Sequence, residues 1–200
     1  MVAESRGNRL NRDRTIEAVK SALEGLQEQV DLEAAGCYEE PQVTLEDAGL
    51  KDTYAKLQNY VNTEIVYTFG TKREVLDADT VAGWVVRKGK QAQLDPELVK
   101  EYVNSLRKKY DTVFHKRKFK TSYGEEVTID QGDYGWWMDV GQETEELMGL
   151  LERGESGERI PVYRQTAASY EMPDYGETYV EINLTAQHLF LYQNGECVLE

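Results

Sequence analysis

Apolar side chains recur at three- and four-residue steps in several segments, the spacing that predicts amphipathic helices. The expected helices cover 11–25, 45–57, 79–85, 95–110 and 143–151. The fourth has the clearest start, because Asp95 can cap it, Pro96 suits the first helical position and Glu97 favours the positive end of the helix dipole. Asp79 is the expected cap of the third helix. Trp84 follows the apolar spacing of that helix, so we expect it in the core.

Short runs rich in β-branched and aromatic residues predict strands between these helices. They cover 30–32, 64–69, 134–138 and 160–163, with a hairpin over 119–129 that turns at Tyr123-Gly124-Glu125. Pro173, Asp174 and Gly176 then mark a linker over 170–177. Helices mixed with strands in this way predict an α+β fold whose main part is a mixed α/β domain.

Three strands follow the linker, at 179–184, 187–192 and 197–199. The last two are joined through Asn194-Gly195, a pair that tolerates the positive φ angles of a tight hairpin. Three short strands cannot bury a core of their own, and we find no partner sheet for them in the sequence. We interpret them as a short C-terminal β-meander from a truncated all-β domain, and we expect 178–200 to be the least stable part of the chain.

The chain also contains an internal repeat at an offset of 128 residues. The stretch from Gly7 to a capping Asn11 (or Asp13) leads into a helix, as does the stretch from Gly135 to Asp139. The apolar positions that match are Val19, Ala22 and Leu23 in the first copy and Leu147, Leu150 and Leu151 in the second. Only the second copy is complete, so we expect residues 1–44 to be the tail of a truncated domain.

Composition excludes some classes of function. The 200 residues carry 23 Lys and Arg against 37 Asp and Glu, a net charge of −14. A general nucleic-acid binder, or a protein that docks on anionic lipid through a polybasic patch, needs a basic surface that this balance does not supply. No run of 18 apolar residues predicts a membrane span, and the first ten residues lack the apolar stretch of a signal peptide.

Cysteine and histidine are too sparse to suggest a metal or redox site. Cys37 and Cys197 lie 160 residues apart, which is neither a metal-binding pair nor a disulfide framework, so we expect two free thiols. His115 and His188 are the only histidines of the sequence. We therefore expect no metal ion and no cofactor.

Two stretches of the sequence resemble parts of one enzyme family. The run Tyr179-Val-Glu-Ile-Asn-Leu-Thr-Ala-Gln-His188-Leu-Phe-Leu-Tyr-Gln-Asn194-Gly195 resembles the opening strands of the YkuD-type L,D-transpeptidase catalytic domain. The upstream chain resembles the peptidoglycan-binding, or pre-catalytic, domain that precedes it in Gram-positive bacteria. The upstream matches are Gly7 to Pro41, Tyr110-Asp111-Thr112, Phe119 with Thr121, and Gly132-Asp-Tyr-Gly-Trp136.

The resemblance implies a cysteine-dependent acyl transfer in the parent protein. Such enzymes cross-link peptidoglycan stem peptides with the Cys of a Ser-His-Gly-Cys motif, supported by an upstream His; the Cys attacks a donor peptide and the acyl group passes to an acceptor amine. This sequence has no Ser-His-Gly-Cys, and neither Cys197 nor His188 matches a catalytic position. We expect no enzymatic activity from this chain and a parent L,D-transpeptidase that forms 3-3 cross-links.

The resemblance also implies a domain organisation. Residues 1–44 are expected to be the C-terminal part of a truncated peptidoglycan-binding domain, 45–170 a pre-catalytic, peptidoglycan-binding-like domain, and 171–200 the linker and first strands of a truncated catalytic domain. The expected role is to position the catalytic domain on peptidoglycan. A stand-alone peptidoglycan-binding module and a purely structural spacer are the alternatives.

Partners and location follow from the same resemblance. The expected partners are peptidoglycan, through its glycan or stem peptide, and the catalytic domain of the full-length protein. We expect no nucleic acid and no direct membrane contact from this segment. The expected location is extracytoplasmic, in the cell wall or anchored to the membrane through a segment outside this chain.

Two groups of side chains are candidates for contact with peptidoglycan. The first is an aromatic shelf for sugar rings, made of Tyr134, Trp136, Trp137 and Tyr123. The second is a basic segment for carboxylates, made of His115, Lys116, Arg117 and Lys118, with Lys108-Lys109 close by in the sequence. Packing of one strand face into the core and a solvated strand edge are the respective alternatives. Glu143, Glu145 and Glu146 resemble paired catalytic carboxylates, but acids are expected in the first turn of a helix.

Overall fold

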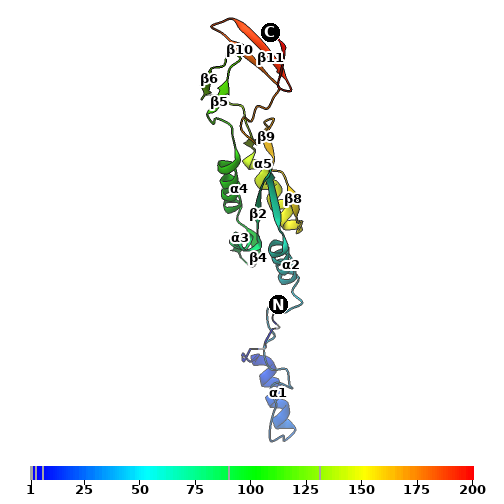
Figure 1. Cartoon of the computed structure of the whole chain (residues 1–200). Helices are drawn as coiled ribbons and strands as arrows, with labels where there is room; N and C mark the ends of the chain where they lie inside the picture. Colours follow the sequence, from blue (N-terminus) through cyan, green and yellow to red (C-terminus); the bar gives the residue numbers. More distant parts are fainter. Residues whose placement is uncertain (1, 3, 6, 90, 131) are drawn as a thin grey trace. The chain divides into compact units, whose positions relative to one another are not determined.

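A computed structural model describes residues 2, 4–5, 7–89, 91–130 and 132–200 of the chain. The chain divides into two compact units, Met1–Ala55 and Lys56–Glu200. Figure 1 colours the chain along its length, with the first unit in blue. No helix among the described residues is both long and apolar enough to cross a membrane.

The first unit is built around one helix, α1 (Arg12–Glu24), as predicted. Of the two expected caps the structure uses Asn11, whose side chain accepts a hydrogen bond from the Arg14 amide at 3.1 Å. The strand expected at 30–32 is wrong. The Asp31 carboxylate instead accepts from the amides of Glu33 and Ala34, at 2.9 and 3.0 Å, and so begins a turn.

The second unit is centred on a three-stranded sheet of order β2-β1-β8. β1 (Ile65–Phe69) was predicted, β2 (Lys72–Leu76) pairs with it antiparallel, and β8 (Gly157–Arg159) pairs with it in parallel. α2 (Ala48–Asn62) leads into this sheet, and α4 (Pro96–Tyr110) and α5 (Val140–Arg153) supply much of the core beside it (Figure 1). The fully buried core side chains include Tyr67, Phe69, Val103, Leu147 and Leu151.

The region between β2 and α4 contains elements that the sequence pattern only partly predicted. The short helix α3 (Ala78–Ala82) is capped by Asp77, not by Asp79, because the Asp77 carboxylate accepts from the Thr80 amide at 2.9 Å. A hairpin of β3 (Val85–Lys88) and β4 (Gln91–Leu94) follows, which was not predicted because Val85 was assigned to the preceding helix. Trp84 is buried in the core, as expected.

A second hairpin, β5 (Arg117–Lys120) with β6 (Glu126–Ile129), forms where it was predicted. The strand expected at 134–138 is reduced to β7 (Trp137–Met138), because Gly135 has a φ of 139° and the Trp136 carbonyl accepts from two amides of the 112–113 turn. The strand expected at 160–163 is also wrong. Pro161 has no N–H to donate to a ladder, and the chain passes from β8 to β9 (Tyr163–Gln165) there.

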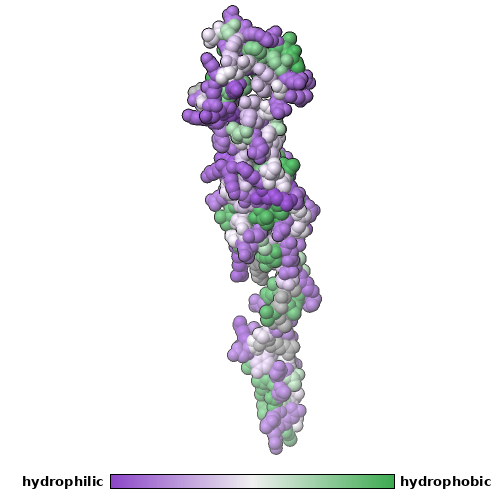
Figure 2. Space-filling view, viewed as in Figure 1, coloured by the Kyte–Doolittle hydropathy of each residue, from purple (hydrophilic) through white to green (hydrophobic). Residues whose placement is uncertain are grey.

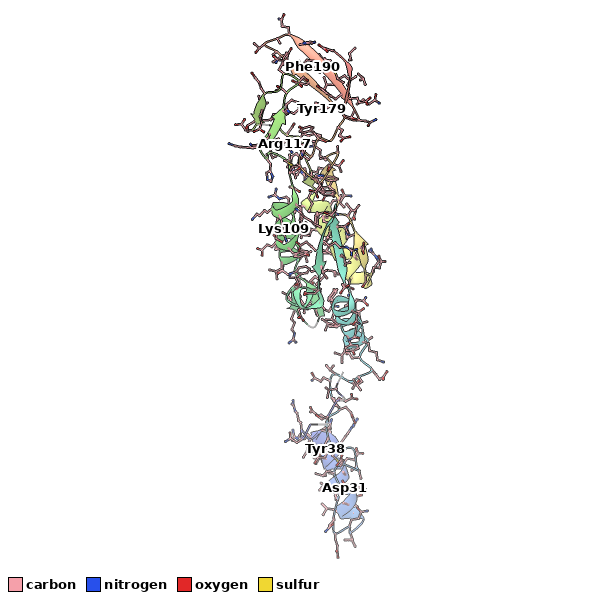
Figure 3. All side chains as sticks on the ribbon, viewed as in Figure 1. Asp31, Tyr38, Lys109, Arg117, Tyr179 and Phe190 are labelled. Carbon is pink, nitrogen blue, oxygen red and sulfur yellow. The ribbon has the colours of Figure 1, made fainter. Side chains whose placement is uncertain are left out.

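The C-terminal meander forms as predicted from β10 (Tyr179–Asn183), β11 (His188–Gln193) and β12 (Glu196–Leu199), with positive φ at both Asn194 and Gly195. The α+β fold with a terminal meander is therefore confirmed. The expectation that these strands lack a partner sheet is wrong. Figure 3 shows Tyr179 and Phe190 near the hairpin, and their rings lie 5.6 Å from Phe119 and 5.7 Å from Tyr123.

The internal repeat is visible in the backbone. Leu10 bridges to Tyr38 just as Met138 pairs with Tyr163, and the two bridges stand directly before the two cap residues. The backbone amide of each cap residue also donates a hydrogen bond to the carbonyl just before the bridge partner. Asn11 donates to Cys37 at 2.7 Å, and Asp139 donates to Val162 at 2.8 Å. The two copies differ in burial, since Leu23 is 70% exposed and its counterpart Leu151 is fully buried. Figure 2 shows hydrophobic residues at the surface of the first unit.

Candidate functional site

The predicted aromatic residues do not share one open surface. The Trp136 ring stacks on Tyr170 with centroids 3.8 Å apart, and its Nε1 donates to the Ser169 carbonyl at 2.8 Å. The Tyr134 hydroxyl accepts from the Ala168 amide at 2.9 Å. Both side chains therefore bind the segment that leads to the meander, and one face of the Trp136 ring is covered by the protein itself.

Tyr123 and Trp137 lie elsewhere. Tyr123 is at the tip of the β5–β6 hairpin, where its hydroxyl meets His188 Nδ1 at 2.9 Å. Trp137 is half-buried and faces Phe114, with ring centroids 5.7 Å apart and planes at 69°. The four predicted aromatic residues thus fall into three separate contacts, and peptidoglycan contact by any of them stays a prediction.

The basic segment is divided in the same way. Arg117 is not a solvated edge residue, because its side chain is 5% exposed and pairs with Asp174, which is fully buried. Arg117 Nε lies 2.6 Å from Asp174 Oδ1, and the same guanidinium donates to three backbone carbonyls. Lys118 pairs with Glu126 at 2.7 Å. His115 and Lys116 are exposed.

Asp174 is the residue that sequence reasoning missed. Burial alone would raise the pKa of its carboxyl, but hydrogen bonds from Arg117 and from the Thr112 hydroxyl, at 2.7 Å, outweigh burial and lower that pKa. The sequence places Asp174 in a Pro- and Gly-containing linker, 57 residues after Arg117. Nothing in the local pattern joins the two.

A pocket of about 320 Å³ lies at the C-terminal end of α4. Cationic and aromatic side chains dominate its lining, which includes Arg107, Lys108, Asp111, Phe114, His115 and Trp137. The acid there accepts from the Met138 amide at 3.1 Å, and burial raises its pKa. Two residues of the predicted site, His115 and Trp137, are therefore brought together here.

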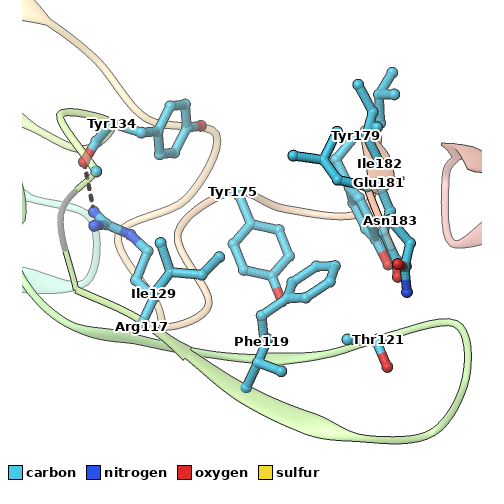
Figure 4. A pocket seen from close by; sticks show the side chains of 14 residues that line it. Arg117, Phe119, Thr121, Ile129, Tyr134, Tyr175, Tyr179, Glu181, Ile182 and Asn183 are labelled. Atoms are coloured by element: carbon cyan, nitrogen blue, oxygen red, sulfur yellow. Dashed lines mark hydrogen bonds between the residues drawn. The ribbon is translucent and has the colours of Figure 1, made fainter. Parts of the chain in front are cut away.

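A larger groove of about 570 Å³ separates the β5–β6 hairpin from β10 (Figure 4). Its lining is mainly apolar and includes Phe119, Val127, Ile129, Tyr175, Tyr179 and Ile182. The buried Glu181 lies beside it and accepts from the amide and the hydroxyl of Ser122, at 2.9 and 2.6 Å. The groove therefore lies between two elements, the hairpin and the meander, that hydrogen bonds already join.

Glu143 is more than an acid in the first turn of a helix. Its carboxylate is fully buried and accepts from the Tyr67 hydroxyl at 2.5 Å, from Arg159 at 2.8 Å and from the Val162 amide at 2.8 Å. Burial raises the pKa of Glu143 despite these partners. Because both oxygens are already engaged, the arrangement holds α5 to the sheet and leaves no oxygen free for acid–base chemistry.

Within the part of the chain that the structure describes, no group of three or more metal-binding side chains comes together. Cys37 is buried and Cys197 is exposed, and both are free thiols as expected.

Comparison with known proteins places the chain in a family. Residues 42–159 match the family described as "Putative peptidoglycan binding domain". No curated protein matches the chain. Among solved structures, a mutant Enterococcus faecium L,D-transpeptidase is 28% identical with a TM-score of 0.53, and covers 74% of this chain. The Ldtfm–avibactam carbamoyl enzyme is 29% identical with a TM-score of 0.55, and covers 76% of this chain.

This chain spans 59% of the length of each of those two enzymes. The family match covers more than half of the chain and includes the sheet, α4, α5 and the β5–β6 hairpin. The chain therefore belongs to this peptidoglycan-binding domain family and is an L,D-transpeptidase-like protein.

Proposed function

We propose that the chain is the non-catalytic portion of a cell-wall L,D-transpeptidase and that it positions the catalytic domain on peptidoglycan. The observation that carries the proposal is the buried pair of Arg117 and Asp174. Arg117 belongs to the family-matched domain, and Asp174 belongs to the linker that leads into the meander. A charge pair removed from water in this way is costly to break, so it fixes the linker on the domain.

A second contact supports the same role. Glu181 of β10 accepts from Ser122 of the hairpin, and the Ser122 hydroxyl lies 2.7 Å from the Tyr192 hydroxyl of β11. Two strands of the meander are thereby held to the hairpin. With the linker fixed as well, the meander has a defined orientation on the family-matched domain.

The other face of the meander fits the proposed second partner, the rest of a catalytic domain. Val180 and Ile182 of β10 and Leu199 of β12 are all more than half exposed. Val180 and Ile182 alternate along β10 with Tyr179 and Glu181, which contact the hairpin, although both also border the open groove. An apolar sheet face of this kind is normally covered by another layer. On this proposal the catalytic Cys lies in that other layer, outside this chain.

The location follows from the partner. A chain that binds peptidoglycan acts outside the cytoplasm, in the cell wall, or at the membrane through an anchor in another segment. One observation favours the alternative of a purely structural spacer. Tyr134 and Trp136 contact other parts of the protein, so their rings are less available to bind sugar.

Co-sedimentation of the 200-residue protein with purified sacculi separates the two roles. We expect the protein to pellet with sacculi and a spacer to stay in solution. Asp174→Ala then separates positioning from a stand-alone binding module. In the positioning role the variant still pellets, but residual dipolar couplings show the meander loosened from the family-matched domain. Unchanged couplings in the variant contradict the positioning role.

A further inference from the structure

The pocket at the end of α4 holds positive charge that the protein does not neutralise. Four basic side chains in the neighbouring segments have acid partners: Lys109 with Glu74, Arg117 with Asp174, Lys118 with Glu126 and Arg164 with Asp139. Arg107, Lys108 and His115, which line the pocket, have no ion pair within the described residues. In a chain of net charge −14 this concentration of unpaired donors needs a reason.

The same pocket has one strained wall. Phe114 is a non-glycine residue with a φ of 62°, in the left-handed region, and the residue is 59% exposed. Bulky side chains avoid this backbone conformation, which persists where the surroundings hold it and which gathers at binding sites. Here it keeps the Phe114 ring edge-on to Trp137, so that two aromatic surfaces border the cations.

Arg107 adds a third observation. Its Nε is buried and has no hydrogen-bond partner among the described residues, so this donor is left unsatisfied at a cost in free energy. Asp111, one helical turn along, is the acid of the pocket and interacts with Arg107 and His115. The single carboxylate of Asp111 does not balance the charges of Arg107 and Lys108, and His115 adds a further donor. The pocket can therefore accept one more anionic group.

We propose that this pocket binds a free carboxylate of a peptidoglycan stem peptide, with the adjoining apolar or sugar part of the muropeptide against Phe114 and Trp137. This inference rests on the proposed function and names its subsite. A single carboxylate fits better than a long polyanion, because a polymer that extends beyond the pocket meets a strongly acidic protein. Arg and Lys donors to a carboxylate are the stronger class of hydrogen bond, and sugar and apolar surfaces pack on aromatic rings.

The test is a titration of the labelled 200-residue protein with a soluble disaccharide–tetrapeptide muropeptide, followed by amide and indole NMR signals. We expect shifts at the Trp137 indole and at residues 107–115. The double variant Arg107→Gln with Lys108→Gln should bind about tenfold more weakly, as the loss of a charge-assisted contact implies. The matched control, Lys72→Gln with Lys88→Gln, removes the same charge from exposed sites and should bind as the wild type does.

Altered ligands and a Phe114 variant identify which part of the muropeptide the pocket binds. A muropeptide whose carboxylates are converted to amides, and the disaccharide without its peptide, should each fail to produce the shifts. Phe114→Asn keeps a residue that tolerates positive φ, so the thermal midpoint should hold or rise while affinity falls about threefold or more. Equal binding of the amidated muropeptide, or wild-type affinity in the double variant, overturns the proposal.

Sacculus binding distinguishes this failure from failure of the proposed function. If the wild type pellets with sacculi and the double variant binds muropeptide equally well, the pocket is wrong and the positioning role stands. If muropeptide binds in the pocket while sacculi leave the protein in solution, the pocket stands and the positioning role is wrong. If the protein neither pellets with sacculi nor binds muropeptide in the pocket, both the pocket and the positioning role are wrong.

Discussion

Two buried acids, Asp174 and Glu143, have opposite pKa shifts because their surroundings differ. Asp174 receives both the forked donors of Arg117 and a hydroxyl, which favour its charged form. Glu143 lies in the core, and the cost of burial outweighs its three donors. Each shift makes stability depend on pH in its own direction.

Asp174→Ala leaves the Arg117 guanidinium buried and unpaired, which costs about 3–5 kcal/mol of unfolding free energy. Urea unfolding at pH 7 measures the loss. Because the folded pKa of Asp174 is lowered, its contribution is present above the unfolded value of about 3.9 and is lost as pH falls through the folded pKa. Glu126→Ala breaks the exposed pair with Lys118 and should cost at most about 1 kcal/mol. An equal loss of unfolding free energy in the two variants would show that the buried pair stabilises the protein no more than the exposed pair does.

Glu143→Gln tests the shift in the other direction. A raised folded pKa means that the native state binds a proton before the unfolded state does, so stability due to this group falls as pH rises towards neutral. We therefore expect the wild type to gain stability relative to Glu143→Gln between pH 7 and pH 5. Urea unfolding of both proteins at the two pH values measures the difference. A difference independent of pH contradicts the raised pKa.

Residue types alone could not predict where Arg117 would lie. In the sequence it belongs to a run of basic residues, and such runs are usually solvated. Its burial depends on Asp174, which reaches it only through the fold. His115 and Trp137 were predicted candidates and line the same pocket, whereas Arg107, which also lines it, was not predicted because its position suggests the exposed side of a helix.

Elements with strong local signals were predicted well. α4 begins at its Asp95-Pro96 start, and the meander turns at Asn194-Gly195. The errors are short strands in which apolar runs compete with turn chemistry, as at Asp31 and Pro161. β3 and β4 were missed because each is only four residues long and half of its residues are polar, and because Val85 fitted the apolar spacing of the preceding helix.

The meander should exchange its amide hydrogens faster than α4. One of its faces is open and its two outer strands have free edges, whereas α4 lies in the core. Glu181→Ala removes the acceptor of Ser122 and should accelerate exchange in β10 and β11 while leaving α4 unchanged. Glu196→Ala, at an exposed position of the same meander, is the matched control. Meander amides as protected as those of α4 contradict this expectation.

At the scale of the whole molecule, we predict that neither cysteine acts as a catalytic nucleophile. Cys37 is in the first unit and is buried. Cys197 pairs in register with Tyr192, four residues and about 13 Å along β11 from His188. We expect no turnover of a tetrapeptide stem, and no effect of Cys37→Ser with Cys197→Ser. Thiol-dependent release of the terminal D-residue by this protein contradicts that expectation.

The internal repeat supports our proposal that residues 1–44 are the C-terminal part of a further peptidoglycan-binding domain. Both copies share a cap, a bridge and a helix, yet only the second has the sheet and α4 beside it. Of the matched apolar positions in the first unit, Val19 and Leu23 are exposed and only Ala22 is buried, whereas Leu147 and Leu151 are fully buried in the second unit. The same local sequence signal thus produces the same local structure in two different environments.

The repeat allows one substitution to be made twice. Leu151→Ala empties a fully buried position and should cost about 2–5 kcal/mol, whereas Leu23→Ala, 128 residues earlier, changes a side chain that is 70% exposed and should shift stability by about 0.5 kcal/mol or less. Chemical unfolding followed by signals from each unit measures both effects. Because the two variants share residue type and helical position, only burial distinguishes them. A cost for Leu23→Ala as large as that for Leu151→Ala would show that the first helix is covered in solution, and would contradict an incomplete domain at residues 1–44.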